Sequence, residues 1–290
     1  MPEARSRLVD GLSVEAWGDD RFGVSGDSPL ARRTLFGGAL LAQALQAADA
    51  TVADEYAVHH LHGQFPRAGR AGTPVEFAVE RVKDGRTLSS RRVVGRQGER
   101  TVVTLEASFA TGRPADPQFA DPSPLRFPAA DVERGALAVA RDGAFGVQAV
   151  DVTDSRNGTA HPDVQTWYRA GGSLPAGSVW PATLLTLVSD MAVPTCAITA
   201  AGIAAGGPDG EGGAGTVATT SVNHTMWFHR PLDAGSWFVV TARPVSTAYG
   251  RGVALGSAYD AEGSHVATIV QEIYTKDPLL LSPRTLGPSL

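Results

Sequence analysis

The sequence predicts an α+β fold made of two similar units, each with a curved antiparallel sheet wrapped around a long central helix. Two observations support this prediction. Each half of the chain holds one long apolar segment of helical character, and short runs that alternate apolar and polar residues follow it. A helix that is apolar on all sides must be covered on all sides, and a strongly curved sheet supplies that cover.

The first predicted central helix is TLFGGALLAQALQAADATV at 34–52, with Thr34 as a possible N-cap. The second lies between Pro181 and Pro194, because proline suits the first turn of a helix and does not continue one. Apolar residues surround this second segment on nearly every side, so we expect it to be buried. Asp190 near its end is therefore unusual, because a buried carboxylate must find partners or lose its charge.

The strand-like runs follow the same plan in both halves. In the first half, PVEFAVERV at 74–82 alternates like a strand, and the segment 89–110 predicts a hairpin that turns near Gly98. In the second half, SWFVVTARP at 236–244 precedes a segment that predicts a hairpin turning near Gly263. The two halves therefore have the same predicted order of elements.

Aromatic positions give the offset between the two halves. Phe65 and Phe228 correspond at an offset of 228 − 65 = 163 residues, and Phe109 and Tyr274 at an offset of 274 − 109 = 165 residues. Sequence identity between the halves is weak, so this is a duplication of topology. A drift of two residues is what small changes in loop length produce.

We divide the chain into an N-terminal unit over 1–112, a proline-rich linker over 113–146 and a C-terminal unit over 147–290. The net charge of −5 comes with no basic block, which argues against a nucleic-acid-binding protein. Cys196 is the single cysteine, so no disulfide within the chain and no cysteine zinc site is expected. Neither a signal peptide nor a membrane span is recognisable, which predicts a cytoplasmic protein.

Five short motifs occur in order along the chain. They are FGG at 36–38, FPRAG at 65–69, KDGRTLSSRRV at 83–93, NHTMWFHRP at 223–231 and VATIVQE at 266–272. Together they resemble the acyl-CoA thioesterase II family, from about residue 10 to residue 276. The resemblance implies a double hotdog fold and hydrolysis of fatty acyl-CoA to a free acid and coenzyme A in lipid metabolism. It further implies no metal or organic cofactor, and association of copies into a homo-oligomer.

The same resemblance assigns the catalytic residues Asp190, Ser221 and Gln271. Asp190 would be the base that activates or orients the attacking water. Ser221 and Gln271 would hold the water or the substrate carbonyl through neutral hydrogen bonds. Ser221 stands where the family more often has threonine, and Asn223 stands where it more often has aspartate.

The duplication predicts one working site per chain. At the two offsets, Ser221 corresponds to Val58 and Gln271 corresponds to Glu106, so the N-terminal unit lacks the catalytic set. We expect the site to lie in the C-terminal unit, with the N-terminal unit as scaffold and as a wall for the acyl chain.

Four further residues are predicted to contact substrate. Gly37 and Gly38 open the first central helix, where backbone N–H groups could stabilise an oxyanion, although these glycines could equally serve only to let the helix meet the sheet. His59 and Trp227 are predicted to line the pocket. The histidines near His59 have no carboxylates at ligand spacing, so we expect no metal site.

Two other functions stay open at this point. The chain could bind acyl-CoA without turning it over, which the full set of Asp190, Ser221 and Gln271 argues against. It could also be an enoyl-CoA hydratase, which typically has a histidine five residues after the aspartate. Thr195 occupies that position, so the hydratase pattern is absent.

Overall fold

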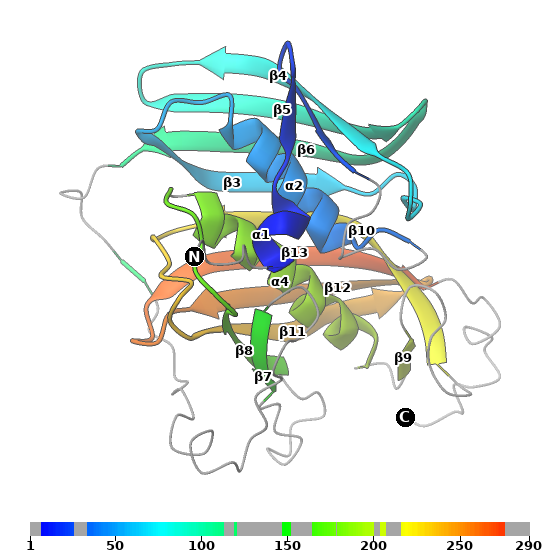
Figure 1. Ribbon diagram of the computed structural model, residues 1–290. Coiled ribbons are helices and arrows are strands. Elements are labelled where there is room, and N and C mark those ends of the chain that lie inside the picture. Colours follow the sequence, from blue (N-terminus) through cyan, green and yellow to red (C-terminus); the bar gives the residue numbers. More distant parts are fainter. Residues whose placement is uncertain are drawn as a thin grey trace, which may run out of the picture.

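Two helices lie side by side at the centre of the computed structural model, which describes residues 7–25, 34–112, 119–120, 147–151, 164–177, 179–199, 204–206 and 216–275. They are α2 (Gly37–Asp49) and α4 (Val179–Thr199), and they pack directly against each other (Figure 1). The short helix α1 (Arg7–Leu12) packs on α2.

The strands form one sheet, in which each half of the chain supplies a continuous part. The first half supplies β1 (Glu15–Gly18), β2 (Arg21–Val24), β3 (Tyr56–Gln64), β4 (Val75–Asp84), β5 (Leu88–Gln97) and β6 (Arg100–Thr111). The second half supplies β7 (Val147–Asp151), β8 (Val164–Ala170), β9 (Ala204–Gly206), β10 (Thr216–Phe228), β11 (Phe238–Ala248), β12 (Arg251–Tyr259) and β13 (His265–Thr275). The strand order is β1, β2, β4, β5, β6, β3, β10, β13, β12, β11, β8 and β7, and β9 pairs with β10.

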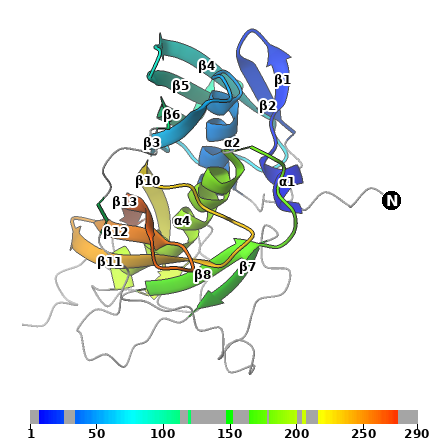
Figure 2. The ribbon, with the colours of Figure 1, turned by 90° about the vertical axis from the view of Figure 1, so that its left-hand side faces the viewer.

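Each half of the sheet curves around one of the two helices (Figure 2). Helix α2 packs on β4, β5 and β6, whereas α4 packs on β8, β11, β12 and β13. Leu41 and Leu45 of α2 and Leu184 and Val188 of α4 are at most 1% exposed. Burial of each such side chain contributes about 1.5–3 kcal/mol to folding, so this shared core joins the two halves. The double hotdog fold is confirmed.

Helix α4 is longer than the sequence predicts. It begins at Val179 and continues past Pro194 to Thr199, although Pro194 was expected to end it. Proline lacks the N–H that would bond the carbonyl of Asp190. Val193 and Ala197, on either side of this break, are fully buried, so tertiary packing outweighs the local cost.

Helix α2 begins later than predicted. Its N-cap is Phe36, with an extended backbone and no side-chain cap, so Thr34 is not the N-cap. Thr34 instead forms an isolated antiparallel bridge with Arg70. This bridge keeps the chain extended up to the first glycine of the helix, and it leaves the first N–H groups of α2 open to partners from elsewhere in the fold.

The two halves meet at an approximate two-fold axis between β3 and β10. These strands pair antiparallel, with His62 opposite Thr225. These two residues are 163 apart in the chain, and His62 Nδ1 lies 2.7 Å from Thr225 Oγ1. A β-bulge lies at His59 in β3 and another at Val222 in β10, again 222 − 59 = 163 residues apart. The duplication of topology therefore extends to a local irregularity of the strands.

The strand register corrects one of the two offsets. Val58 pairs with Phe109 and Ser221 pairs with Ile273, so Phe109 corresponds to Ile273 and not to Tyr274. The offset in these last strands is therefore 273 − 109 = 164 residues. Gln271 then corresponds to Ala107 and not to Glu106. Side-chain burial agrees, because Gln271 and Ala107 are buried whereas Glu106 is exposed.

Most of the predicted linker at 113–146 lies outside the described residues. None of the described helices combines the length and the apolar character that a membrane crossing requires.

Candidate active site

Asp190 projects from the middle of α4 and is only 5% exposed. Its Oδ1 atom accepts a hydrogen bond from the Ser221 hydroxyl of β10 at 2.8 Å and another from the Gln271 side-chain amide of β13. Neighbouring strands thus bring the three residues of the predicted catalytic set into direct contact. The buried carboxylate has the partners that its position in an apolar helix requires.

Gln271 is fully buried, and both the oxygen and the nitrogen of its side-chain amide form hydrogen bonds. Its Nε2 donates to Asp190 and also to Ser221 Oγ, at 2.9 Å from the latter. Its Oε1 lies 2.9 Å from Nδ1 of His224, which is directly opposite on β10. Because Gln271 lies on an apolar strand face, each of these bonds satisfies a group that would otherwise be costly to bury.

The first turn of α2 also contacts the carboxylate. The backbone N–H of Gly38 donates a hydrogen bond to Asp190. A side chain at Gly38 would meet the carbonyl oxygen of Leu187 at 2.6 Å, and one at Gly37 would meet Asp190 Oδ2 at 2.9 Å. Both glycines therefore allow the two helices to approach. The N–H of Gly38, which was expected to face an oxyanion, thus contributes to the ionised carboxylate.

Burial raises the pKa of the Asp190 carboxyl above its ordinary value. The nearby His224 ring and the hydrogen bonds from Ser221, Gln271 and Gly38 oppose that rise. Burial also lowers the pKa of His224, which favours the neutral ring. A carboxylate with a raised pKa is a stronger base than an exposed one, provided that enough hydrogen bonds keep it ionised.

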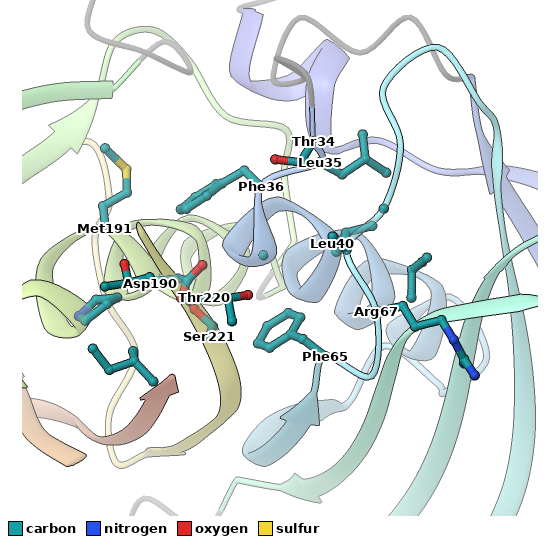
Figure 3. A pocket seen from close by; sticks show the side chains of 17 residues that line it. Thr34, Leu35, Phe36, Leu40, Phe65, Arg67, Asp190, Met191, Thr220 and Ser221 are labelled. Atoms are coloured by element: carbon teal, nitrogen blue, oxygen red, sulfur yellow. Dashed lines mark hydrogen bonds between the residues drawn. The ribbon is translucent and has the colours of Figure 1, made fainter. Parts of the chain in front are cut away.

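A cavity of about 260 Å³ opens beside Asp190. Its walls come from both halves of the chain, and they include Phe36, Gly37, Leu40, Phe65, Arg67, Asp190, Met191, Ser221 and Ile273. Figure 3 shows Asp190 and Ser221 on one side of this cavity and Arg67 on the other, with Phe65 between them and Phe36 above Asp190. The cavity is thus mostly apolar, with a carboxylate at one side and a cation at the other.

The structure does not bring His59 or Trp227 to this cavity. His59 lies at the bulge of β3, and its Nε2 is buried without a hydrogen-bond partner among the described residues. Trp227 lies near the end of β10, is 40% exposed, and packs against His60 in a tilted arrangement with ring centres 5.3 Å apart. Trp227 lies six residues beyond Ser221 on β10, and His59 lies on the neighbouring strand β3, so neither side chain is among the residues that line the cavity.

His224 is the main residue of the site that the sequence did not single out. It lies in the motif NHTMWFHRP, which served only as part of the family resemblance. The pairing of β10 with β13 puts it opposite Gln271. A register for these two strands would have revealed the contact, because residues directly opposite each other share a face. No group of three or more possible metal ligands occurs within the described part of the chain.

Family models match both halves of the chain. Residues 25–110 match the acyl-CoA thioesterase N-terminal domain, and residues 114–275 match the acyl-CoA thioesterase C-terminal domain. Acyl-CoA thioesterase 2 of Haemophilus influenzae is 28% identical over 290 residues, covering 94% of this chain and 98% of that protein. Acyl-coenzyme A thioesterase 8 of Mus musculus is 27% identical over 261 residues, covering 82% of this chain and 79% of that protein.

Solved structures give the same result. The acyl-CoA thioesterase II TesB2 from Mycobacterium marinum superposes with a TM-score of 0.74 at 26% identity, covering 93% of this chain and 97% of that chain. A tesB protein of Mycobacterium avium subs paratuberculosis gives a TM-score of 0.75 at 25% identity, covering 93% of this chain and 98% of that chain. Because both halves match in order, the chain belongs to the acyl-CoA thioesterase II (TesB) family of thioester hydrolases.

Proposed function

We propose that this protein hydrolyses fatty acyl-CoA thioesters to a free acid and coenzyme A, with Asp190 as the general base. One observation carries the proposal. Asp190 is a buried carboxylate that lines the cavity while Ser221, Gln271 and Gly38 all donate hydrogen bonds to it. This arrangement keeps a base ionised in an apolar setting, beside a space that could hold an activated carbonyl.

The two oxygens of Asp190 have different surroundings, which suggests how water is activated. Oδ1 accepts from Ser221 and Gln271, whereas Oδ2 lies near Gly37 at the cavity. In the proposed reaction a water bound at Oδ2 gives its proton to Asp190 as its oxygen attacks the thioester carbon. The C–O bond forms, the C–S bond breaks, and the proton passes to the departing thiolate.

Ser221 and Gln271 take a narrower role here than the one first expected. Their donors are directed at Asp190, so we propose that they hold the carboxylate and not the water or the carbonyl. For the developing oxyanion we propose the N–H of Gly37. Gly37 lines the cavity at the start of α2, where the helix dipole favours negative charge.

The rest of the cavity suggests how substrate lies in it. Phe36, Leu40 and Phe65 offer an apolar wall for the acyl chain. Arg67 is exposed at the opposite side from Asp190, where it could meet the negative charge of coenzyme A.

The test is thiol release from acyl-CoAs of two to eighteen carbons, for wild type and Asp190→Asn. We expect wild-type turnover and a loss of about two or more powers of ten in kcat for the variant, the size usual for an acid–base group. Asp10→Asn, the same chemical change at an exposed position of α1, is the control and should keep the wild-type rate. Equal rates for wild type and Asp190→Asn would refute Asp190 as the base.

Two further measurements, made beside thiol release, separate the alternative functions. Acyl-CoA binding without thiol release at any chain length would identify a binding module. Loss of crotonyl-CoA absorbance without thiol release would identify a hydratase.

A further inference from the structure

His224 is a fully buried histidine with both ring nitrogens engaged. Nδ1 lies 2.9 Å from Gln271 Oε1, and Nε2 lies 2.8 Å from the hydroxyl of Ser189 on α4. The ring therefore connects the helix that carries Asp190 to the strand that carries Gln271. It does not line the cavity, so it has no direct route to substrate.

The hydrogen-bond partners define the protonation of the ring. The amide oxygen of Gln271 only accepts, so the hydrogen at that contact belongs to Nδ1. The Ser189 hydroxyl lies within reach of both Nε2 and the carbonyl oxygen of Thr186, at 2.9 Å from the latter. In the neutral ring with the hydrogen on Nδ1, Nε2 carries the lone pair, and the single hydroxyl hydrogen of Ser189 is shared between Nε2 and the Thr186 carbonyl oxygen. Among the described residues, the ionisable groups that act on His224 are Asp190 on α4 and His62 on β3.

This protonation has a consequence for Gln271. The two ends of a side-chain amide have nearly the same shape, so packing alone does not choose between them. The acceptors Asp190 and Ser221 take the NH₂ group of Gln271, which leaves the amide oxygen for His224, and an N–H at Nδ1 adds a further preference for this orientation. The flipped amide would place its oxygen against the carboxylate and its NH₂ against the Nδ1–H, with two repulsive contacts.

The orientation also affects the charge of Asp190. A flipped amide could accept a hydrogen bond from a protonated Asp190, so it would favour the neutral acid. The observed amide can only donate, so it favours the ionised base. His224 thereby stabilises one protonation state of a residue that it does not touch through a direct hydrogen bond.

The first half of the chain provides an internal comparison. The approximate two-fold matches His224 with Leu61, Gln271 with Ala107, and Ser221 with Val58. Leu61 and Ala107 are at most 2% exposed, so the same strand position accepts leucine in the same fold. The polar residues occur together in the half whose helix carries the carboxylate, and the fold itself does not require them.

We propose that His224 is a positioning residue of the active site: its Nδ1–H fixes the Gln271 amide, which then holds Asp190 as the ionised base. The inference rests on the proposed function, because it assumes that Asp190 acts as a base in hydrolysis.

Three substitutions test it. His224→Leu copies Leu61 and removes both ring nitrogens, His224→Asn keeps an N–H donor close to the Nδ1 position, and His224→Gln places an amide near Nε2 instead. We expect His224→Leu to lower kcat about ten-fold or more while KM stays within about two-fold, because substrate does not contact the ring. The acid limb of the rate–pH profile should move to higher pH. His224→Asn should recover most of the rate, and His224→Gln should recover less.

A purely structural role would give a different pattern. All three variants would then lose activity in proportion to their loss of thermal stability, with the acid limb unmoved, and the inference would be wrong. Wild-type kcat and an unmoved acid limb in His224→Leu would also overturn it. If His224→Leu does not fold, equal rates for His224→Asn and His224→Gln would overturn it in the same way.

The failure of this inference is distinguishable from the failure of the proposed function. If Asp190→Asn worked at the wild-type rate, Asp190 would not be the base, and His224 would have no base to position. If Asp190→Asn were inactive while His224→Leu were fully active, only the inference on His224 would be wrong, and the proposed function would stand.

Discussion

The backbone N–H of Gly38, in the first turn of α2, donates a hydrogen bond to the carboxylate of Asp190 on α4. The start of a helix carries a partial positive charge, so α2 stabilises the ionised carboxylate of the other half. The candidate site therefore lies at the contact between the two halves. Asp190, Ser221 and Gln271 all come from the C-terminal unit, and the N-terminal unit adds the Gly38 N–H and part of the cavity wall.

Gly38→Ala should disrupt this contact. The added methyl group would lie 2.6 Å from the carbonyl oxygen of Leu187 and 3.0 Å from Cβ of Asp190, so the helices must separate. We expect a loss of about 1–3 kcal/mol in the free energy of unfolding, as for other overpacked sites, together with a lower kcat. Urea unfolding and thiol release measure the two effects. Gly112→Ala, which meets no atom within 4 Å, is the control, and equal behaviour of the two variants would contradict the prediction.

Ser221 offers a finer test, because its hydroxyl donates to Asp190 Oδ1 at 2.8 Å. Ser221→Ala removes a bond that lowers the pKa of Asp190, so that pKa should rise and the acid limb of activity should move to higher pH. We expect kcat to fall about ten- to a hundred-fold, in line with the loss of one hydrogen bond to a charged group. Ser221→Thr keeps the hydroxyl and should keep most of the rate. A threonine variant as slow as the alanine variant would show that packing, not the hydroxyl, matters here.

The pH dependence of wild-type activity follows from the same carboxyl. Burial raises the pKa of Asp190, and the base works only when ionised, so activity is lost as pH falls through the raised pKa. We expect the acid limb of kcat/KM to have its midpoint above 3.8, the ordinary value for an aspartate. The residual activity of Asp190→Asn should lack this limb. An acid limb of the same midpoint in Asp190→Asn would assign it to another group.

Much of the fold could be predicted from the sequence because its signals are local. The alternation of apolar and polar residues located β4 and β11, and the turns near Gly98 and Gly263 occur where positive φ angles of 57° and 86° favour glycine. The contact between Asp190, Ser221 and Gln271 could be anticipated from the family resemblance, which assigned all three to one catalytic set.

The errors concern properties that depend on other parts of the chain. An offset wrong by one residue matched Gln271 with the exposed Glu106, because a shift of one position moves every side chain to the opposite face of a strand. Helix α4 continues past Pro194 because tertiary packing stabilises it there, and the local sequence does not predict that packing. The donation from Gly38 depends on how two helices far apart in sequence approach each other.

Asp49 provides a prediction on stability that is independent of catalysis. It is the last residue of α2, where the helix dipole disfavours negative charge. Burial raises its pKa to about 6, and the nearby Asp54 adds to the rise. A folded-state pKa above the unfolded value means that folding favours the protonated acid. Stability is therefore lost as pH rises from about 4 through about 6, where the folded protein must also ionise this group.

Asp49→Asn removes the charge and should stabilise the protein at about pH 7.5 but hardly at all at about pH 4. Because the group is partly exposed, we expect a gain on the order of 1 kcal/mol, or a few degrees in Tm for a chain of this size. Thermal unfolding of wild type and Asp49→Asn at both pH values measures this difference. Asp10→Asn, at an exposed position of α1, should show no such dependence. An equal Tm difference between Asp49→Asn and wild type at both pH values would mean that the substitution acts through packing, because only the ionised carboxylate opposes folding here.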